Sequence, residues 1–288
     1  MADIFVADIL SGMVVIGVLA SACFGIALHA GRHLGRRARD FAAVTMVLAI
    51  YGYAHFFWYN PRLSWVLPFS NLVVLGNWFP LAAGALGGLA WGRLPGRWFR
   101  KLLFLGGLAG ASVYSMVYPL MGESPECGNA WSSDICLQTT PLTCTPACAA
   151  TLLRAHGISV SEGEMAKACL TRDGSTWMGL YRGLKLKTQH TDWDVEVLCC
   201  DAAELVKQDG PLIMAVGLPP RETSEDHLKM AEWGWKKGVG HSVIFLRQRS
   251  CGRFLVADPT PGWGQENWSR QDLEYLFRGT AMRLVKRY

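Results

Sequence analysis

Four long apolar stretches occupy most of the first 121 residues, and they constrain the fold more than any other feature. They lie at about 10–29, 41–59, 73–92 and 102–121. Each approaches the roughly 20 residues that an α-helix needs to cross the hydrocarbon core of a bilayer. The whole chain is 51% hydrophobic and 18% charged, which agrees with a membrane portion. We therefore predict a bundle of four transmembrane helices over residues 1–121.

The positive charge of this part is concentrated in two short segments beside the apolar stretches. Residues 1–121 contain nine Lys and Arg against three Asp and no Glu. Eight of the nine follow the first or the third stretch: Arg32, Arg36, Arg37, Arg39, Arg93, Arg97, Arg100 and Lys101. Because cytoplasmic loops are enriched in Lys and Arg, four spans with this pattern place the residues after 122 outside the cytoplasm, on the periplasmic or extracellular side. The first basic cluster follows its apolar stretch, which indicates a retained anchor and not a cleaved secretory signal.

The remainder of the chain is nearly neutral, with a net charge of −1 out of a total of +5. A domain that binds nucleic acid carries a basic patch of its own. We therefore expect a lipid bilayer and no nucleic acid among the partners of this chain.

Eight of the nine cysteines lie after residue 126, on the predicted outer side of the membrane, where disulfides are permitted. Cys127 and Cys136 flank a short polar stretch, and we predict a disulfide between them. The other pairings stay open. Cys199, Cys200 and Cys251 lack the CxxC spacing that is typical of zinc sites, so we expect no metal and no cofactor.

The segment QTTPLTCTPACAATLLRAHG, which begins at Gln138, predicts a turn followed by a helix from Cys144 to His156. Gly157 ends this helix, and Pro146 falls in its first turn, where a missing N–H costs little. The Cys144 thiol thus lies at a helix N-terminus, where the partial positive charge stabilises a thiolate, the nucleophilic form. A cysteine in such a place is more often structural, so its assignment depends on other residues.

An α+β domain with an antiparallel sheet is predicted for residues 138–288, after a linker at 122–137. The capping-box pair Ser161 and Glu164 predicts a second helix over 161–170. Four strands follow, at 195–200, 211–218, 241–248 and 253–258, each rich in apolar or β-branched residues and bounded by Gly, Pro or Asp.

Two polar residues stand at matching ends of the last two predicted strands. His241 opens one strand and Asp258 closes the next. If these strands pair as an antiparallel hairpin, the start of the first lies beside the end of the second, and the two side chains meet. A carboxylate that accepts the imidazole N–H orients the ring and leaves its other nitrogen to deprotonate a thiol.

Gln138, Cys144 in C-T-P-A, then G-H-S-V-I and A-D-P occur in this order, and together they resemble the double-glycine leader peptidases. These are papain-like domains fused to bacteriocin-exporting ABC transporters, and the resemblance covers about residues 134–285. It implies that Cys144 is the nucleophile, His241 the base and later the acid, and Asp258 the orienting carboxylate. It further implies that the Gln138 amide donates to the developing oxyanion.

The chain departs from this family in three places. Thr145 stands where the family usually has Gly, so the turn at the nucleophile could differ. Residues 221–238 resemble an insertion with Leu228, Ala231 and Trp235 at helical spacing, which predicts a lid, an exosite, a membrane-facing helix or a plain surface loop. The chain has no phosphate-binding glycine loop of the Walker type, which argues against coupled export.

These observations predict a membrane-anchored cysteine peptidase that cleaves a peptide or leader segment outside the cytoplasm. Two alternatives stay open. One is a catalytically silent domain that binds a peptide and hands it to a membrane partner protein. The other is a thiol amidase or acyltransferase that acts on cell-wall peptides with the same thiolate.

Overall fold

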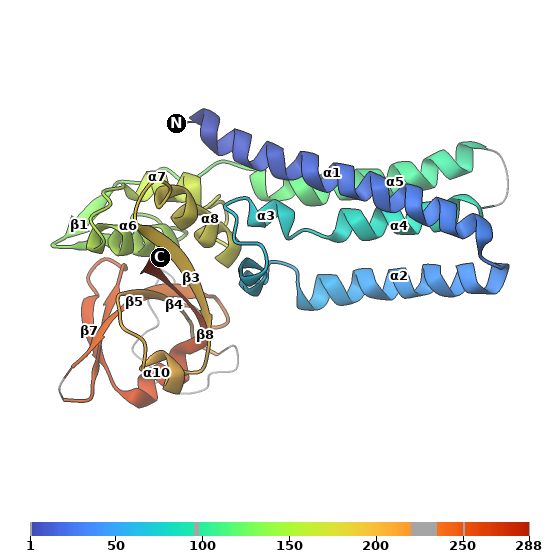
Figure 1. Cartoon of the computed structure of the whole chain (residues 1–288). Helices are drawn as coiled ribbons and strands as arrows, with labels where there is room; N and C mark the ends of the chain where they lie inside the picture. The colour runs from blue at the N-terminus through green and yellow to red at the C-terminus, as the bar shows by residue number, and fades with distance from the viewer. Residues whose placement is uncertain (1, 95–97, 220–234, 250, 288) are drawn as a thin grey trace. The chain divides into compact units, whose positions relative to one another are not determined.

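The computed structural model describes residues 2–94, 98–219, 235–249 and 251–287 (Figure 1). Contacts divide the chain into two units, Met1–Met121 and Gly122–Tyr288. Residues 122–137, which we predicted to be a linker, belong to the second unit. Of the predicted insertion at 221–238, only the last four residues are described, so the expectations for Leu228 and Ala231 lie outside the described part.

The first unit is helical. Its elements are α1 (Ala2–His33), α2 (Arg36–Phe56), α3 (Leu72–Leu75), α4 (Phe79–Trp91) and α5 (Trp98–Val117), with short 3-10 turns at Pro61–Trp65 and Tyr118–Leu120. Helices α1 and α4 pack closely, because Gly84 and Gly88 let the backbones meet. A Cβ at either glycine would collide with the carbonyl oxygen of Ala20 or Phe24.

Among the described residues, three segments are long and apolar enough to cross a membrane: Ala7–His33, Leu72–Trp91 and Trp98–Leu120. We predicted four, and the count is not supported because α2 does not qualify. Its apolar stretch is short. Charged residues at 36–40 precede it within the helix, and Tyr51, Tyr53 and His55 dilute its end.

The third predicted span is interrupted instead of continuous. A break between α3 and α4 leaves Asn77 buried, and its Nδ2 donates to Ser115 Oγ on α5 at 3.0 Å. The hydroxyl of Tyr53 donates to the Gly76 carbonyl, at 2.5 Å. Both contacts satisfy polar groups at the break, as an apolar environment requires.

The two basic segments of the first unit lie at the same end of its helices. Arg93, just after α4, forms a bidentate ion pair with Asp40 near the start of α2, with Nε–Oδ1 at 2.6 Å and Nη2–Oδ2 at 3.0 Å. The ion pair brings the start of α2 next to the end of α4.

The second unit is an α+β domain with an antiparallel sheet, as predicted. Its helices are α6 (Cys144–Ala155), α7 (Glu162–Ala168), α8 (Trp177–Lys187), α9 (Ala202–Leu205) and α10 (Arg270–Leu276). Its main strands are β3 (Trp193–Cys199), β4 (Leu212–Val216), β5 (His241–Gln248), β6 (Phe254–Asp258), β7 (Gly264–Trp268) and β8 (Phe277–Lys286). These six pair in the order β3-β8-β4-β5-β6-β7, every pair antiparallel. A separate hairpin joins β1 (Ala130–Ser132) and β2 (Ile135–Leu137).

Both faces of the central strands are covered, which explains why β4 is buried at every position. One set of alternate residues, including Met214 and Phe245, packs in a cluster with Leu273 of α10. On the opposite face, α6 packs against β4 and β5. Nearly all of α6 is buried, so this helix and the start of β5 are held in a fixed relation.

Candidate active site

Cys144 is the first residue of α6 and the only half-buried residue in a run of buried ones. A tight turn precedes it, in which the Thr143 hydroxyl lies 3.1 Å from the Thr140 carbonyl oxygen and donates to it. Because the first N–H groups of a helix have no intrahelical acceptor, the Cys144 sulfur lies in a region of partial positive charge. The sulfur is thus held at the N-terminal end of a buried helix, in a residue that is itself only half-buried.

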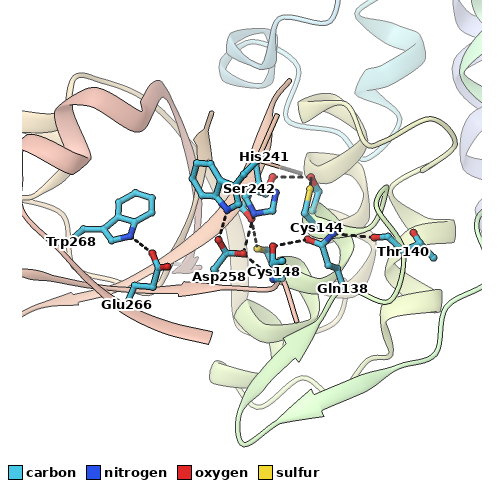
Figure 2. Close-up of polar contacts among 12 residues, drawn as sticks. Gln138, Thr140, Cys144, Cys148, His241, Ser242, Asp258, Glu266 and Trp268 are labelled. Carbon is cyan, nitrogen blue, oxygen red and sulfur yellow. Dashed lines mark hydrogen bonds and ion pairs between the residues drawn. The ribbon is translucent and has the colours of Figure 1, made fainter. Parts of the chain in front are cut away.

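His241 and Asp258 meet as the strand positions require. His241 begins β5, Asp258 ends β6, and these strands pair antiparallel with Ile244 opposite Ala257. His241 Nε2 lies 3.1 Å from Asp258 Oδ1, and both side chains are completely buried (Figure 2). A buried charge of this kind persists only when hydrogen bonds replace its lost hydration.

Those hydrogen bonds come from residues around Asp258. The Thr260 backbone N–H donates to Oδ1 at 2.9 Å, and the Trp235 indole N–H donates to Oδ2 at 2.6 Å. Burial raises the pKa of Asp258. The hydrogen bonds with His241 and Thr260 lower this pKa by more than burial raises it, so it lies below the ordinary value. Asp258 is therefore held as a carboxylate.

Sequence reasoning did not assign Trp235 to the site. We placed it only on the apolar face of a predicted insertion, whereas its indole is buried against the His241 ring, with centroids 4.9 Å apart. The centroid of the Trp268 ring lies 6.2 Å from the centroid of the Trp235 ring. The one sequence signal was its position six residues before His241, which carries no chemical meaning until the fold is known.

The second imidazole nitrogen, His241 Nδ1, is buried and has no hydrogen-bond partner of ordinary geometry among the described residues. Its electrostatic partner is the Cys144 thiol. Burial lowers the pKa of His241, but the charges of Cys144 and Asp258 raise it to about 9. Burial likewise raises the pKa of Cys144, yet the positive imidazole lowers it to below the ordinary thiol value. The two opposed pKa shifts thus favour a thiolate beside an imidazolium.

Gln138 lies just past β2 and is buried against the loop that follows Asp258. Its backbone N–H donates to the Pro259 carbonyl at 2.8 Å, and its Oε1 accepts from the Thr260 hydroxyl at 3.5 Å. Its Nε2 donates to the Thr140 carbonyl at 3.1 Å, in the turn directly before Cys144 (Figure 2). The fold thus brings all four residues singled out in the sequence into one place.

The predicted disulfide between Cys127 and Cys136 is absent, because both residues are free thiols. The Cys127 sulfur contacts the Pro125 carbonyl at 3.3 Å instead. Burial raises the pKa of Cys127 to about 11 and that of Cys136 to about 12, so both are protonated near neutral pH. Across the described residues, no group of three or more His, Cys, Asp or Glu side chains is placed to hold a metal.

No protein-family model matches this chain, and no curated protein matches it. Solved structures do. The peptidase domain of Streptococcus ComA, a bi-functional ABC transporter involved in quorum sensing, is 15% identical, with a TM-score of 0.40 over 52% of this chain and 96% of that one. A double glycine motif protease from an AMS/PCAT transporter, in complex with the leader peptide, is 14% identical, with a TM-score of 0.40 over 58% of this chain and 96% of that one. The peptidase domain of Streptococcus mutans ComA is 16% identical, with a TM-score of 0.34 over 53% and 98%. Because these identities and TM-scores are low, the assignment of the site rests on its own geometry.

Proposed function

We propose that this chain is a membrane-anchored cysteine peptidase of papain-like design. One observation carries the proposal: the thiol of a half-buried cysteine at a helix N-terminus interacts with an imidazole whose far nitrogen is bonded to a buried carboxylate. This is the arrangement of nucleophile, base and orienting group that thiol peptidases need.

In the proposed reaction, the Cys144 thiolate attacks a peptide carbonyl and forms a carbon–sulfur bond. The oxyanion receives hydrogen bonds from the Gln138 amide and from a backbone N–H near Cys144. The His241 imidazolium then gives its proton to the leaving nitrogen, the peptide bond breaks, and a thioester remains. His241, now neutral, takes a proton from water as the water attacks the thioester, which releases the acid and restores the thiolate.

Asp258 and Trp235 act through His241. The carboxylate accepts the Nε2 proton, which leaves Nδ1 directed to the sulfur and stabilises the imidazolium form. The Trp235 indole holds the second carboxylate oxygen and covers the imidazole ring. Both are positioning residues, because neither touches the reacting atoms.

The apolar helices support a location of this reaction at a membrane. Three candidate spans support membrane association, and the ion pair between Arg93 and Asp40 supports a common side for the two basic loops. A common side requires the chain to return across the bilayer between α1 and α4; if that side is cytoplasmic, residues after 122 then lie outside the cytoplasm. We propose that the substrate is a peptide or leader segment reached on that outer side, close to the bilayer.

The test is covalent capture by an electrophilic peptide probe in purified membranes. We expect the probe to label the full chain, and we expect Cys144→Ala and His241→Ala to abolish or strongly reduce labelling. Cys251→Ala is the matched control, because Cys251 is exposed and lies in the turn between β5 and β6, at the opposite end of these strands from His241 and Asp258, and it should label as wild type does. Unchanged labelling of Cys144→Ala and His241→Ala would refute the proposal. Peptide binding without capture would instead support the silent binding domain.

A further inference from the structure

The residues that follow the nucleophile and the base are bonded to each other. Thr145 comes directly after Cys144 on α6, and Ser242 comes directly after His241 on β5. Their hydroxyl oxygens lie 2.8 Å apart, and the two residues are only 7% and 4% exposed. A second contact joins the same elements, since the Cys148 thiol donates to the Ser242 carbonyl at 3.2 Å (Figure 2).

Among the described residues, Thr145 Oγ1 has one other hydrogen-bond contact, with the Cys144 sulfur at 3.9 Å. Each hydroxyl has a single proton to donate, so two arrangements are possible. If Thr145 donated to Ser242, the Ser242 proton would be buried with no acceptor among the described residues. If Ser242 donates to Thr145, both protons are used, because the Thr145 proton then points to the sulfur. Since an unsatisfied buried donor is costly, the second arrangement is favoured.

We infer that Ser242 and Thr145 form a two-hydroxyl chain that ends on the Cys144 sulfur and stabilises its thiolate. The inference rests on the proposed function, because it concerns the same nucleophile. Thr145 contacts the reacting atom directly, whereas Ser242 is a positioning residue that acts through Thr145. The chain also links α6 to β5, so it holds nucleophile and base in register.

Several titratable groups face the thiolate besides these hydroxyls. They are His241 from β5, Asp258 from β6 through His241, Cys148 from α6, and Cys136 from β2 beside Cys148. The Ser242 backbone N–H also lowers the pKa of Cys144, after the opposing effect of burial and the effect of His241. Substitutions of the two hydroxyl side chains leave all of these groups in place, so their effect on the thiolate can be measured separately.

The experiment measures how fast iodoacetamide alkylates Cys144 as a function of pH. It uses the full chain in detergent and quantifies the Cys144 peptide by mass spectrometry, with the exposed Cys251 as the internal reference. Thr145→Val keeps the branched shape and removes the donor. We expect it to raise the pH needed for alkylation and to slow the reaction about 3- to 10-fold below the thiolate pKa, as expected for the loss of one ordinary hydrogen bond. Thr145→Ser keeps the hydroxyl and should react as wild type does.

Ser242→Ala separates the two proton arrangements by sign. In the chain we infer, it slows alkylation slightly, about 2-fold, because Thr145 loses the donor that polarises it. In the opposite arrangement, it would free the Thr145 proton for the sulfur and speed alkylation. Faster alkylation of Ser242→Ala, or an unchanged profile of Thr145→Val, would overturn the inference.

The double variant Thr145→Val with Ser242→Ala controls for folding. Removing both partners leaves no unsatisfied hydroxyl, so its thermal midpoint should recover toward the wild-type value while its alkylation stays slow. Failure of the proposed function would look different. In that case, wild-type Cys144 would alkylate as an ordinary thiol does, and His241→Ala would not change its profile.

Discussion

The two units of this chain place their apolar side chains in opposite ways. Of the twenty-nine large hydrophobic residues that are exposed within the described part, twenty-seven lie in the first unit, and only Leu142 and Val239 lie in the second. Of the fifteen buried polar or charged residues in the described part, twelve lie in the second unit, and six of these surround the candidate site: Gln138, Thr145, His241, Ser242, Asp258 and Thr260. The exposed apolar surface of the first unit is suited to contact with lipid. The second unit has few exposed large hydrophobic residues and buries polar side chains around its site.

The comparison is tested most strongly at Asp258. Asp258→Asn keeps the shape but cannot hold the positive charge on His241, so we expect peptide cleavage or probe capture to slow by about 10³- to 10⁴-fold. The rate of probe capture in membranes measures the loss. The pKa of His241 should fall in the same variant, because the carboxylate contributes to raising it. Cleavage within tenfold of wild type would show that this buried carboxylate has a structural role alone.

A smaller loss is expected at Gln138. Gln138→Ala removes the amide donor to the developing oxyanion, so kcat should fall about 10²- to 10³-fold with little change in KM. Alkylation of Cys144 by iodoacetamide forms no oxyanion and should stay within about 2-fold of wild type. Equal losses in both assays would show that Gln138 supports the turn before Cys144 and does not donate to the oxyanion.

The lipid-facing side of the comparison is tested by a charge in α1. Val18 is 63% exposed and lies within the candidate span Ala7–His33. Val18→Arg should reduce the fraction of protein that resists alkaline extraction from membranes, because a central arginine costs about 2.5–3.5 kcal/mol of insertion free energy. Val239→Arg, at an exposed position of the second unit, should leave extraction unchanged. The same result for both variants would show that the two surfaces do not differ in this respect.

The smallest effect is expected at Trp235. Trp235→Phe keeps an aromatic ring over His241 and removes the hydrogen bond to Asp258 Oδ2, so we expect about a tenfold loss of kcat. A merely structural role would not change the pH profile. We expect its basic limb, which reports loss of the His241 proton, to move to lower pH. An unchanged basic limb would contradict the positioning role.

Much of this site could be predicted from the sequence because its signals are local. The turn before Cys144 and the helix that follows it depend on neighbouring residues, and the places of His241 and Asp258 follow from one hairpin. Trp235 could not be predicted, since its contact with Asp258 depends on the path of a separate segment. The place of β8 between β3 and β4 also escaped prediction, because it joins strands that are distant in sequence.

Two other expectations, four spans and a disulfide, are not supported by the structure, for physical reasons that a sequence pattern does not carry. The count of four spans relied on the length of an apolar stretch, whereas α2 includes charged residues at its start. The disulfide relied on the compartment and on spacing along the chain, whereas Cys127 contacts Pro125 and Cys136 is buried.

The central claim is that Cys144 and His241 form a thiolate–imidazolium pair, and the pH dependence of Cys144 alkylation tests it most directly. Both shifts favour this pair over the neutral one: the pKa of Cys144 is lowered, and the pKa of His241 is raised to about 9. Wild-type Cys144 should therefore react at a pH well below that needed by His241→Ala, in which burial still raises the pKa of the thiol and the imidazolium no longer lowers it. Activity should rise with pH as Cys144 ionises and fall as His241 loses its proton near pH 9. Superimposable alkylation profiles for wild type and His241→Ala would contradict the account.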